Sequence, residues 1–97
     1  MFRHVVLIKF KPDVTPEQIE QLTNRLESVS DAIPQVRAVA CGSDRGLIQG
    51  SSDFAIVVDF DSIDDYNVYL RHDDHVALAG LLGPLVESRA VVDYEFH

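Results

Sequence analysis

Residues 2–11 read FRHVVLIKFK, and apolar residues occur at both the even and the odd positions of this run. Successive side chains of a strand point to opposite faces of a sheet, so Phe2 and Val6 share one face, and Val5 and Leu7 share the other. Apolar side chains in the middle of both faces are typical of a strand that is covered on both sides. The run therefore predicts a strand in a sheet that needs two covering layers.

The next segment carries the clearest helix start in the chain. Thr15 suits the N-cap, and Pro16 suits the first helical position, where its missing N–H costs nothing. Gln18 stands three residues after Thr15 and completes a capping box. Apolar residues then recur at helical spacing until Pro34, which ends the pattern. These signals predict a helix over residues 16–33.

The remaining chain alternates between strand and helix patterns. We expect strands at residues 36–44, 54–60 and 88–96, a loop at residues 46–52, and a helical region at residues 63–82 with a break near His72-Asp73. The order is β-α-β-β-α-β within one domain, residues 1–97. It predicts an α+β, ferredoxin-like fold, with helices on one face of a four-stranded antiparallel sheet.

The second face of that sheet has no covering layer within the chain. It carries Val5 and Leu7, and an exposed apolar face of this size favours association. Pairing of two copies about a two-fold axis is the simplest cover. We therefore expect a homodimer formed through the sheet face.

The charge and the cysteine content of the chain indicate which partners and which cellular compartment to expect. The formal net charge is −8 and no basic stripe is visible, so we expect neither nucleic acid nor an anionic membrane surface as a partner. We also expect no signal peptide and no membrane-spanning segment, because no apolar run is long enough. Cys41 is the one cysteine, which suits a reducing compartment. A cytoplasmic protein is the expectation.

The candidate chemistry gathers in residues 69–75, which read YLRHDDH. In one continuous helix Tyr69, His72 and His75 follow each other at i, i+3 and line one side. His4 lies on the more apolar face of the first strand and can point at the same helices. Histidine exchanges protons near neutral pH, and a phenol can stabilise an enolate. The alternative is that these histidines satisfy backbone groups or face water.

Other readings of the same residues stay open. One alternative is a metal site formed by His72 and His75 with Asp73 or Asp74, but a third well-spaced ligand is missing. No metal site is therefore predicted, and the aspartates are assigned to helix capping. Arg89 binds an anionic ligand if it points inward and is an ordinary surface or interface residue if it points outward. Nucleotide-binding, Rossmann and serine-hydrolase motifs are absent.

The whole chain resembles the stress-responsive dimeric α/β-barrel domain family. The resemblance rests on residues 4–11 (HVVLIKFK), Ile33-Pro34, Gly42, the Tyr69-x-x-His72-x-x-His75 segment and residues 91–94 (VVDY). It implies a ferredoxin-like chain and a homodimer whose two sheets form a barrel. A plant polyketide cyclase of this family uses residues that match His75 as catalytic histidine, with His4 and Tyr69 in support.

The chain departs from that cyclase around the expected pocket. Leu26 and Thr23 replace two aromatic residues, Arg89 replaces a leucine, and the loop after the second strand is shorter by two residues in an ungapped count. The acid–base groups are kept while the acyl-chain pocket is changed. The resemblance therefore does not carry the substrate over.

Three functional hypotheses follow. The first is a cofactor-independent acid–base enzyme for aldol, lyase or isomerase chemistry on a small carbonyl substrate, with His75 as base or acid, His4 orienting and Tyr69 polarising the carbonyl. The expected substrate-binding residues are His72, Ile56, Arg89 and Val91. The second is a non-catalytic dimer that binds a small apolar or aromatic ligand or serves in stress protection. The third is a monooxygenase-like or haem-handling protein.

Overall fold

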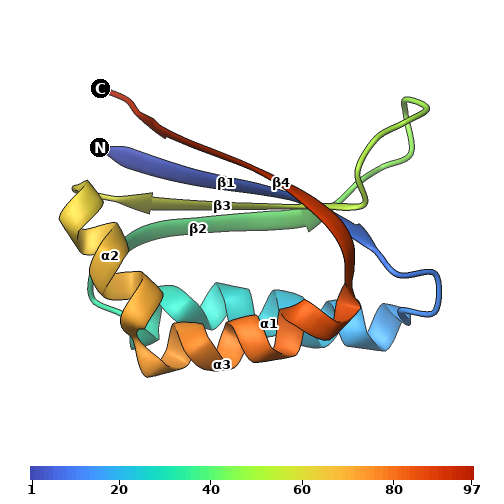
Figure 1. Cartoon of the computed structure of the whole chain (residues 1–97), viewed down its shortest axis with the longest axis horizontal. Coiled ribbons are helices and arrows are strands. Elements are labelled where there is room, and N and C mark those ends of the chain that lie inside the picture. The colour runs from blue at the N-terminus through green and yellow to red at the C-terminus, as the bar shows by residue number, and fades with distance from the viewer.

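The computed structural model describes residues 1–97 and contains the expected elements in the expected order (Figure 1). The strands are β1 (Phe2–Phe10), β2 (Val36–Ser43), β3 (Phe54–Phe60) and β4 (Val86–Glu95), and the helices are α1 (Pro16–Ala32), α2 (Ile63–Arg71) and α3 (Asp73–Leu82), with a 3-10 turn at Gly83–Leu85 before β4. The predicted α+β, ferredoxin-like fold is confirmed.

The sheet has the order β2-β3-β1-β4, and every neighbouring pair is antiparallel. β1 is therefore central and pairs with both β3 and β4. His4 lies opposite Val58 of β3 and opposite Asp93 of β4. Directly opposed residues share a face, so this register decides which side chains of β4 meet those of β1.

Local signals place the first helix as predicted. The Thr15 hydroxyl accepts a hydrogen bond from the Gln18 backbone N–H, and the Gln18 side chain accepts one from the Thr15 N–H. Helix α1 then ends at Ala32, immediately before Ile33 and Pro34. The capping box is confirmed, since both of its hydrogen bonds form.

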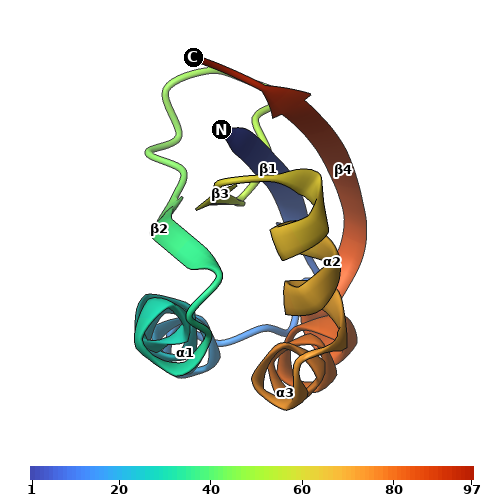
Figure 2. The same ribbon diagram turned by 90° about the vertical axis from the view of Figure 1, so that its left-hand side faces the viewer.

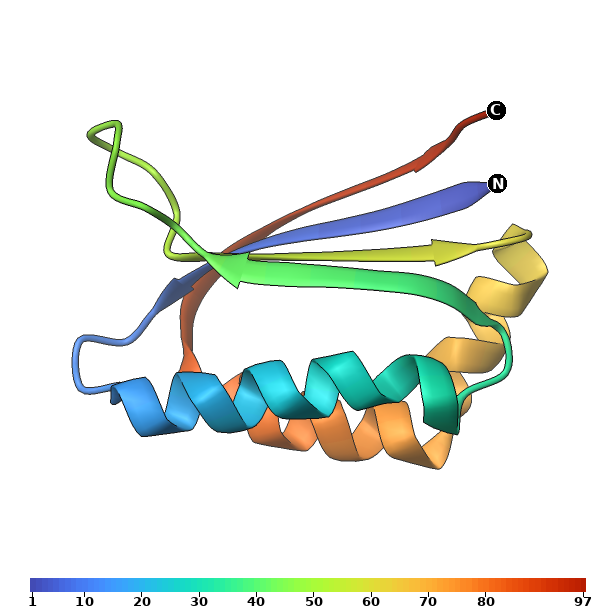
Figure 3. The ribbon, with the colours of Figure 1, turned by 180° about the vertical axis from the view of Figure 1, so that it is seen from behind.

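The helices cover one face of the sheet and leave the other open (Figures 1 and 3). The helix side holds one cluster of 16 buried apolar residues, in which Ile8, Leu22 and Phe60 are completely buried. On the open side Leu7 and Val92 remain exposed. Seen from its end, α1 lies beneath β2, while β4 curves upward from the end of α3 (Figure 2).

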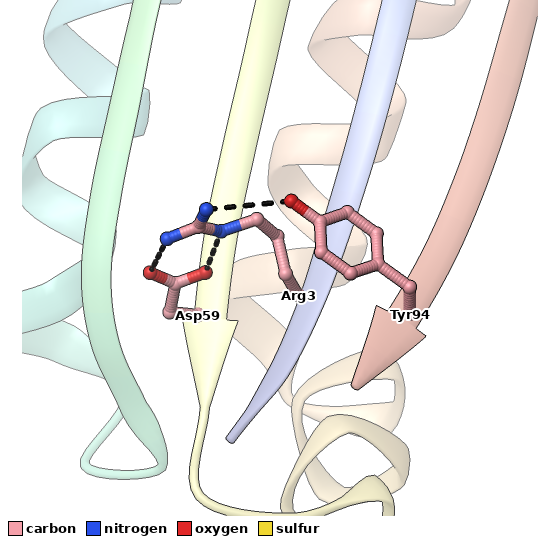
Figure 4. A network of polar contacts seen from close by, with 3 residues as sticks. All are labelled: Arg3, Asp59 and Tyr94. Atoms are coloured by element: carbon pink, nitrogen blue, oxygen red, sulfur yellow. Dashed lines mark hydrogen bonds and ion pairs between the residues drawn. The ribbon is translucent and has the colours of Figure 1, made fainter. Parts of the chain in front are cut away.

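A polar network ties the strands together on the open face (Figure 4). The Arg3 guanidinium donates two hydrogen bonds to the Asp59 carboxylate, at 2.7 and 2.9 Å, and a third to the Tyr94 hydroxyl at 3.3 Å. The same guanidinium lies 4.3 Å from the centre of the Phe96 ring. The charge of Arg3 is therefore compensated within the chain.

Candidate functional site

A histidine–aspartate pair joins β1 to β4 on the helix side of the sheet. His4 Nδ1 lies 2.5 Å from a carboxylate oxygen of Asp93, and only 14% of the His4 side chain is exposed. The contact exists because the two residues are direct partners in the antiparallel register. The sequence did not predict Asp93 as a site residue, because its neighbour in the sheet lies 89 positions away in the chain.

Four aromatic rings form a continuous row from β1 to α3. The ring centres of His4 and Tyr66 are 5.1 Å apart, those of Tyr66 and Tyr69 are 6.3 Å apart, and those of Tyr69 and His75 are 4.3 Å apart. The three residues expected in the site, His4, Tyr69 and His75, thus belong to one cluster. Tyr66 links them and was not predicted, although its i, i+3 spacing to Tyr69 is a signal for a shared helix face.

The surroundings of His75 favour the neutral imidazole. Burial lowers its pKa below the ordinary value of 6.5, and the neighbouring His4 lowers it further, while the hydrogen bond to Leu70 acts in the opposite direction. That hydrogen bond joins Nδ1 of His75 to the Leu70 carbonyl oxygen at 3.2 Å. A carbonyl oxygen only accepts, so Nδ1 carries the proton and Nε2 keeps a free lone pair. Nε2 is therefore suited to act as a base.

Tyr69 beside it is held as a proton donor. The residue is 3% exposed, and burial raises its pKa to about 12, with Tyr66 as a smaller cause. The hydroxyl makes no hydrogen bond within the chain, and no buried side-chain oxygen or nitrogen is left without a partner. The Tyr69 hydroxyl thus keeps its proton and has no partner within the chain, so it can donate a hydrogen bond to a bound molecule.

His72 lies at the junction of two helices rather than within one. Helix α2 ends at Arg71, and His72 is the N-cap of α3, where its Nδ1 accepts a hydrogen bond from the Asp74 N–H at 3.1 Å. The expected break at this point is confirmed. The prediction that Tyr69, His72 and His75 line one side of a single helix is wrong. The break at His72 places Tyr69 on α2 and His75 on α3. No group of three histidine, cysteine, aspartate or glutamate side chains converges in the chain.

The other residues expected to bind substrate differ in access. Ile56 is 4% exposed and belongs to the core, whereas Val91 on β4 is 42% exposed. Arg89 lies opposite Ile8 of β1, on the helix side of the sheet, and it is exposed. The pKa of Tyr66 is raised, chiefly by burial and also by Asp93, and the charge of Arg89 acts in the opposite direction. Arg89 is thus electrostatically coupled to the row of rings.

A surface hollow of about 380 Å³ lies between α3 and β4. It is lined by Ala79 and Leu82 of α3 and by Arg89 of β4, among others. His75, Ala79 and Leu82 are at i, i+4 and i+7, which places them on one face of the helix. The hollow itself does not reach His4, Tyr69 or His75.

Comparisons with known proteins give one consistent picture. The sequence model of the family described as the stress responsive A/B barrel domain matches residues 2–96. The stress-response A/B barrel domain-containing protein HS1 of Arabidopsis thaliana is 26% identical over 95 residues, which cover 96% of this chain and 87% of that protein. Olivetolic acid cyclase of Cannabis sativa is 23% identical over 94 residues, with 95% and 93% covered.

Solved structures agree with the sequence comparisons. A dimeric ferredoxin-like protein of unknown function from Thermobifida fusca has a TM-score of 0.91 and is 36% identical, and the match covers 98% of this chain and 90% of that one.

None of the helices in the present structure combines the length and apolarity that crossing a membrane requires.

Proposed function

The chain belongs to the stress responsive A/B barrel domain family, as its sequence indicated, and from that premise we propose that it is an acid–base enzyme acting on a small carbonyl substrate. The reaction class is proton abstraction next to a carbonyl, as in aldol cyclisation, lyase or isomerase steps, and no cofactor is required by it. The similarity to olivetolic acid cyclase supports this class. The contact between Tyr69 and His75 carries the proposal.

The roles follow from the protonation of the two groups. Nε2 of His75 removes a proton from the carbon next to the carbonyl, so that a C–H bond breaks and an N–H bond forms. The Tyr69 hydroxyl donates a hydrogen bond to the oxygen on which negative charge develops. His4, held by Asp93, places a second imidazole at the far end of the row, where it orients the substrate or returns a proton to the product.

Hydrogen–deuterium exchange tests the abstraction step without knowledge of the natural substrate. We expect the protein to accelerate exchange of the protons next to the carbonyl of a simple ketone such as 2-octanone, followed by proton NMR in D₂O. His75→Ala should lower this rate by about 10²–10⁴-fold, the usual contribution of a positioned base. The control is His97→Ala, which removes an exposed imidazole outside the row. Equal rates for the native chain and a folded His75→Ala variant contradict the proposal.

The hollow between α3 and β4 supports a second candidate, a non-catalytic domain that binds a small apolar or aromatic molecule. In that case ligand binding survives the loss of both His4 and His75. A double variant that binds a fluorescent apolar probe as tightly as the native chain, in a protein without exchange activity, favours this candidate.

We further propose that two copies associate through the open face of the sheet. Leu7, Val92 and Tyr94 are 41%, 61% and 41% exposed there, and the Thermobifida fusca relative is described as dimeric. Val92→Asp places a charge in this face and should shift the chain from dimer to monomer in sedimentation. Val68→Asp is the matched control, because Val68 is an exposed valine on α2. Unchanged sedimentation of Val92→Asp contradicts this interface.

A further inference from the structure

Arg89 lies on the helix side of the sheet without an acidic partner. It lies on the helix side of β4, opposite Ile8, on the same side as His4 and Asp93. The chain has 16 acidic and 8 basic residues, yet Arg89 forms no ion pair. Its guanidinium therefore keeps its full set of donors for a group from outside the chain.

The surroundings of Arg89 suit a molecule with an apolar part. Arg89 lines the hollow of about 380 Å³ together with Ala79, Leu82 and Val86. Beyond it along β4, Val91 is 42% exposed on the same side of the strand. An apolar chain that runs from Arg89 toward the row of rings thus meets apolar side chains along its way.

The two ends of this path carry different chemistry. Asp93 and Arg89 act in opposite directions on the pKa of Tyr66, so Tyr66 is within electrostatic range of both. Asp93 lies four positions after Arg89, which corresponds to about 13 Å along the strand. One end offers a free guanidinium, and the other reaches His4, from which the row of rings leads to Tyr69 and His75.

We propose that the site takes a substrate that carries a carboxylate at the end of an apolar chain, with Arg89 binding the carboxylate. The guanidinium presents a planar pair of N–H donors that matches both carboxylate oxygens. This inference rests on the proposed function for the reacting end of the molecule, which lies at Tyr69 and His75. Glu87 lines the same hollow and opposes an anion there, so Glu87→Gln should tighten carboxylate binding.

Direct binding measurements test the inference separately from catalysis. The probes are octanoate and octanamide, which share a chain length and differ in charge, titrated at neutral pH by calorimetry and by backbone amide NMR. We expect octanoate to bind about tenfold more tightly than octanamide and to shift the resonances of Ala79 and Leu82. Arg89→Leu should remove the preference, and Arg89→Lys should retain part of it. Arg25→Leu, on the exposed side of α1, changes the net charge equally and should preserve it.

The outcomes separate the two proposals. A preference for octanoate that depends on Arg89 and persists in His75→Ala supports the carboxylate site, even if ketone exchange is absent and the enzymatic proposal fails. Equal binding of both probes, absence of saturable octanoate binding, or a preference that Arg89→Leu leaves unchanged overturns the carboxylate site, whatever the exchange rates are.

Discussion

Replacement of Tyr69 by phenylalanine should remove a specific loss of stability at alkaline pH. The folded chain raises the pKa of Tyr69 from its ordinary value of 10.0 to about 12, chiefly through burial. Above about pH 10 the unfolded chain releases this proton while the folded chain keeps it, so rising pH favours the unfolded state. A pKa difference of this size corresponds to about 2.7 kcal/mol, because each unit is worth about 1.4 kcal/mol.

Urea unfolding of the native chain and of Tyr69→Phe, followed by circular dichroism from about pH 8 to pH 12, measures this term. The hydroxyl has no partner within the chain, so the two proteins should differ by no more than about 1 kcal/mol at pH 8. Between pH 8 and pH 12 the native chain should lose about 2.3 kcal/mol more than the variant, most of it above pH 10. Both other tyrosines are present in each protein, so the difference reports on Tyr69 together with its coupling to Tyr66. A difference that stays constant over this range refutes the assignment of Tyr69 as a protected proton donor.

Three further outcomes are expected. Phe60→Ala should lower the free energy of unfolding by about 3–5 kcal/mol in urea titrations, because Phe60 is fully buried and its ring packs against Tyr66 and Tyr69. Exchange activity should rise with pH with a midpoint below 6.5, the ordinary pKa that burial lowers at His75, and a midpoint above 6.5 contradicts this role. For the same reason the stability that the neutral His75 contributes should be complete above pH 6.5 and should be lost as pH falls through the lowered pKa. In urea titrations the free energy of unfolding of His75→Ala should therefore fall less steeply below pH 6.5 than that of the native chain.

Several parts of the site were accessible from local sequence. The segment from Tyr69 to His75 and the alternation that places His4 on the helix side of β1 both identified groups that lie in the row of rings. The role expected of His72 depended on a continuous helix. The structure divides that helix at His72, where the imidazole accepts the Asp74 N–H and completes a cap. A histidine before two aspartates fits either a site residue on a continuous helix or an N-cap. Only the observed helix boundaries distinguish the two roles.

The sequence by itself determined the order of the elements and the two-faced character of the sheet. The Thr15 capping box, the stop at Pro34 and the alternation in residues 2–11 act over a few residues, so they can be read without knowledge of distant contacts. The tertiary structure alone decided that Asp93 meets His4, that Tyr66 joins two parts of the site, and that Arg89 faces the helix side. Strand register sets these contacts: β1 and β4 are the first and last strands in the chain but neighbours in the sheet, and a shift of one residue would turn Arg89 and Asp93 to the opposite face.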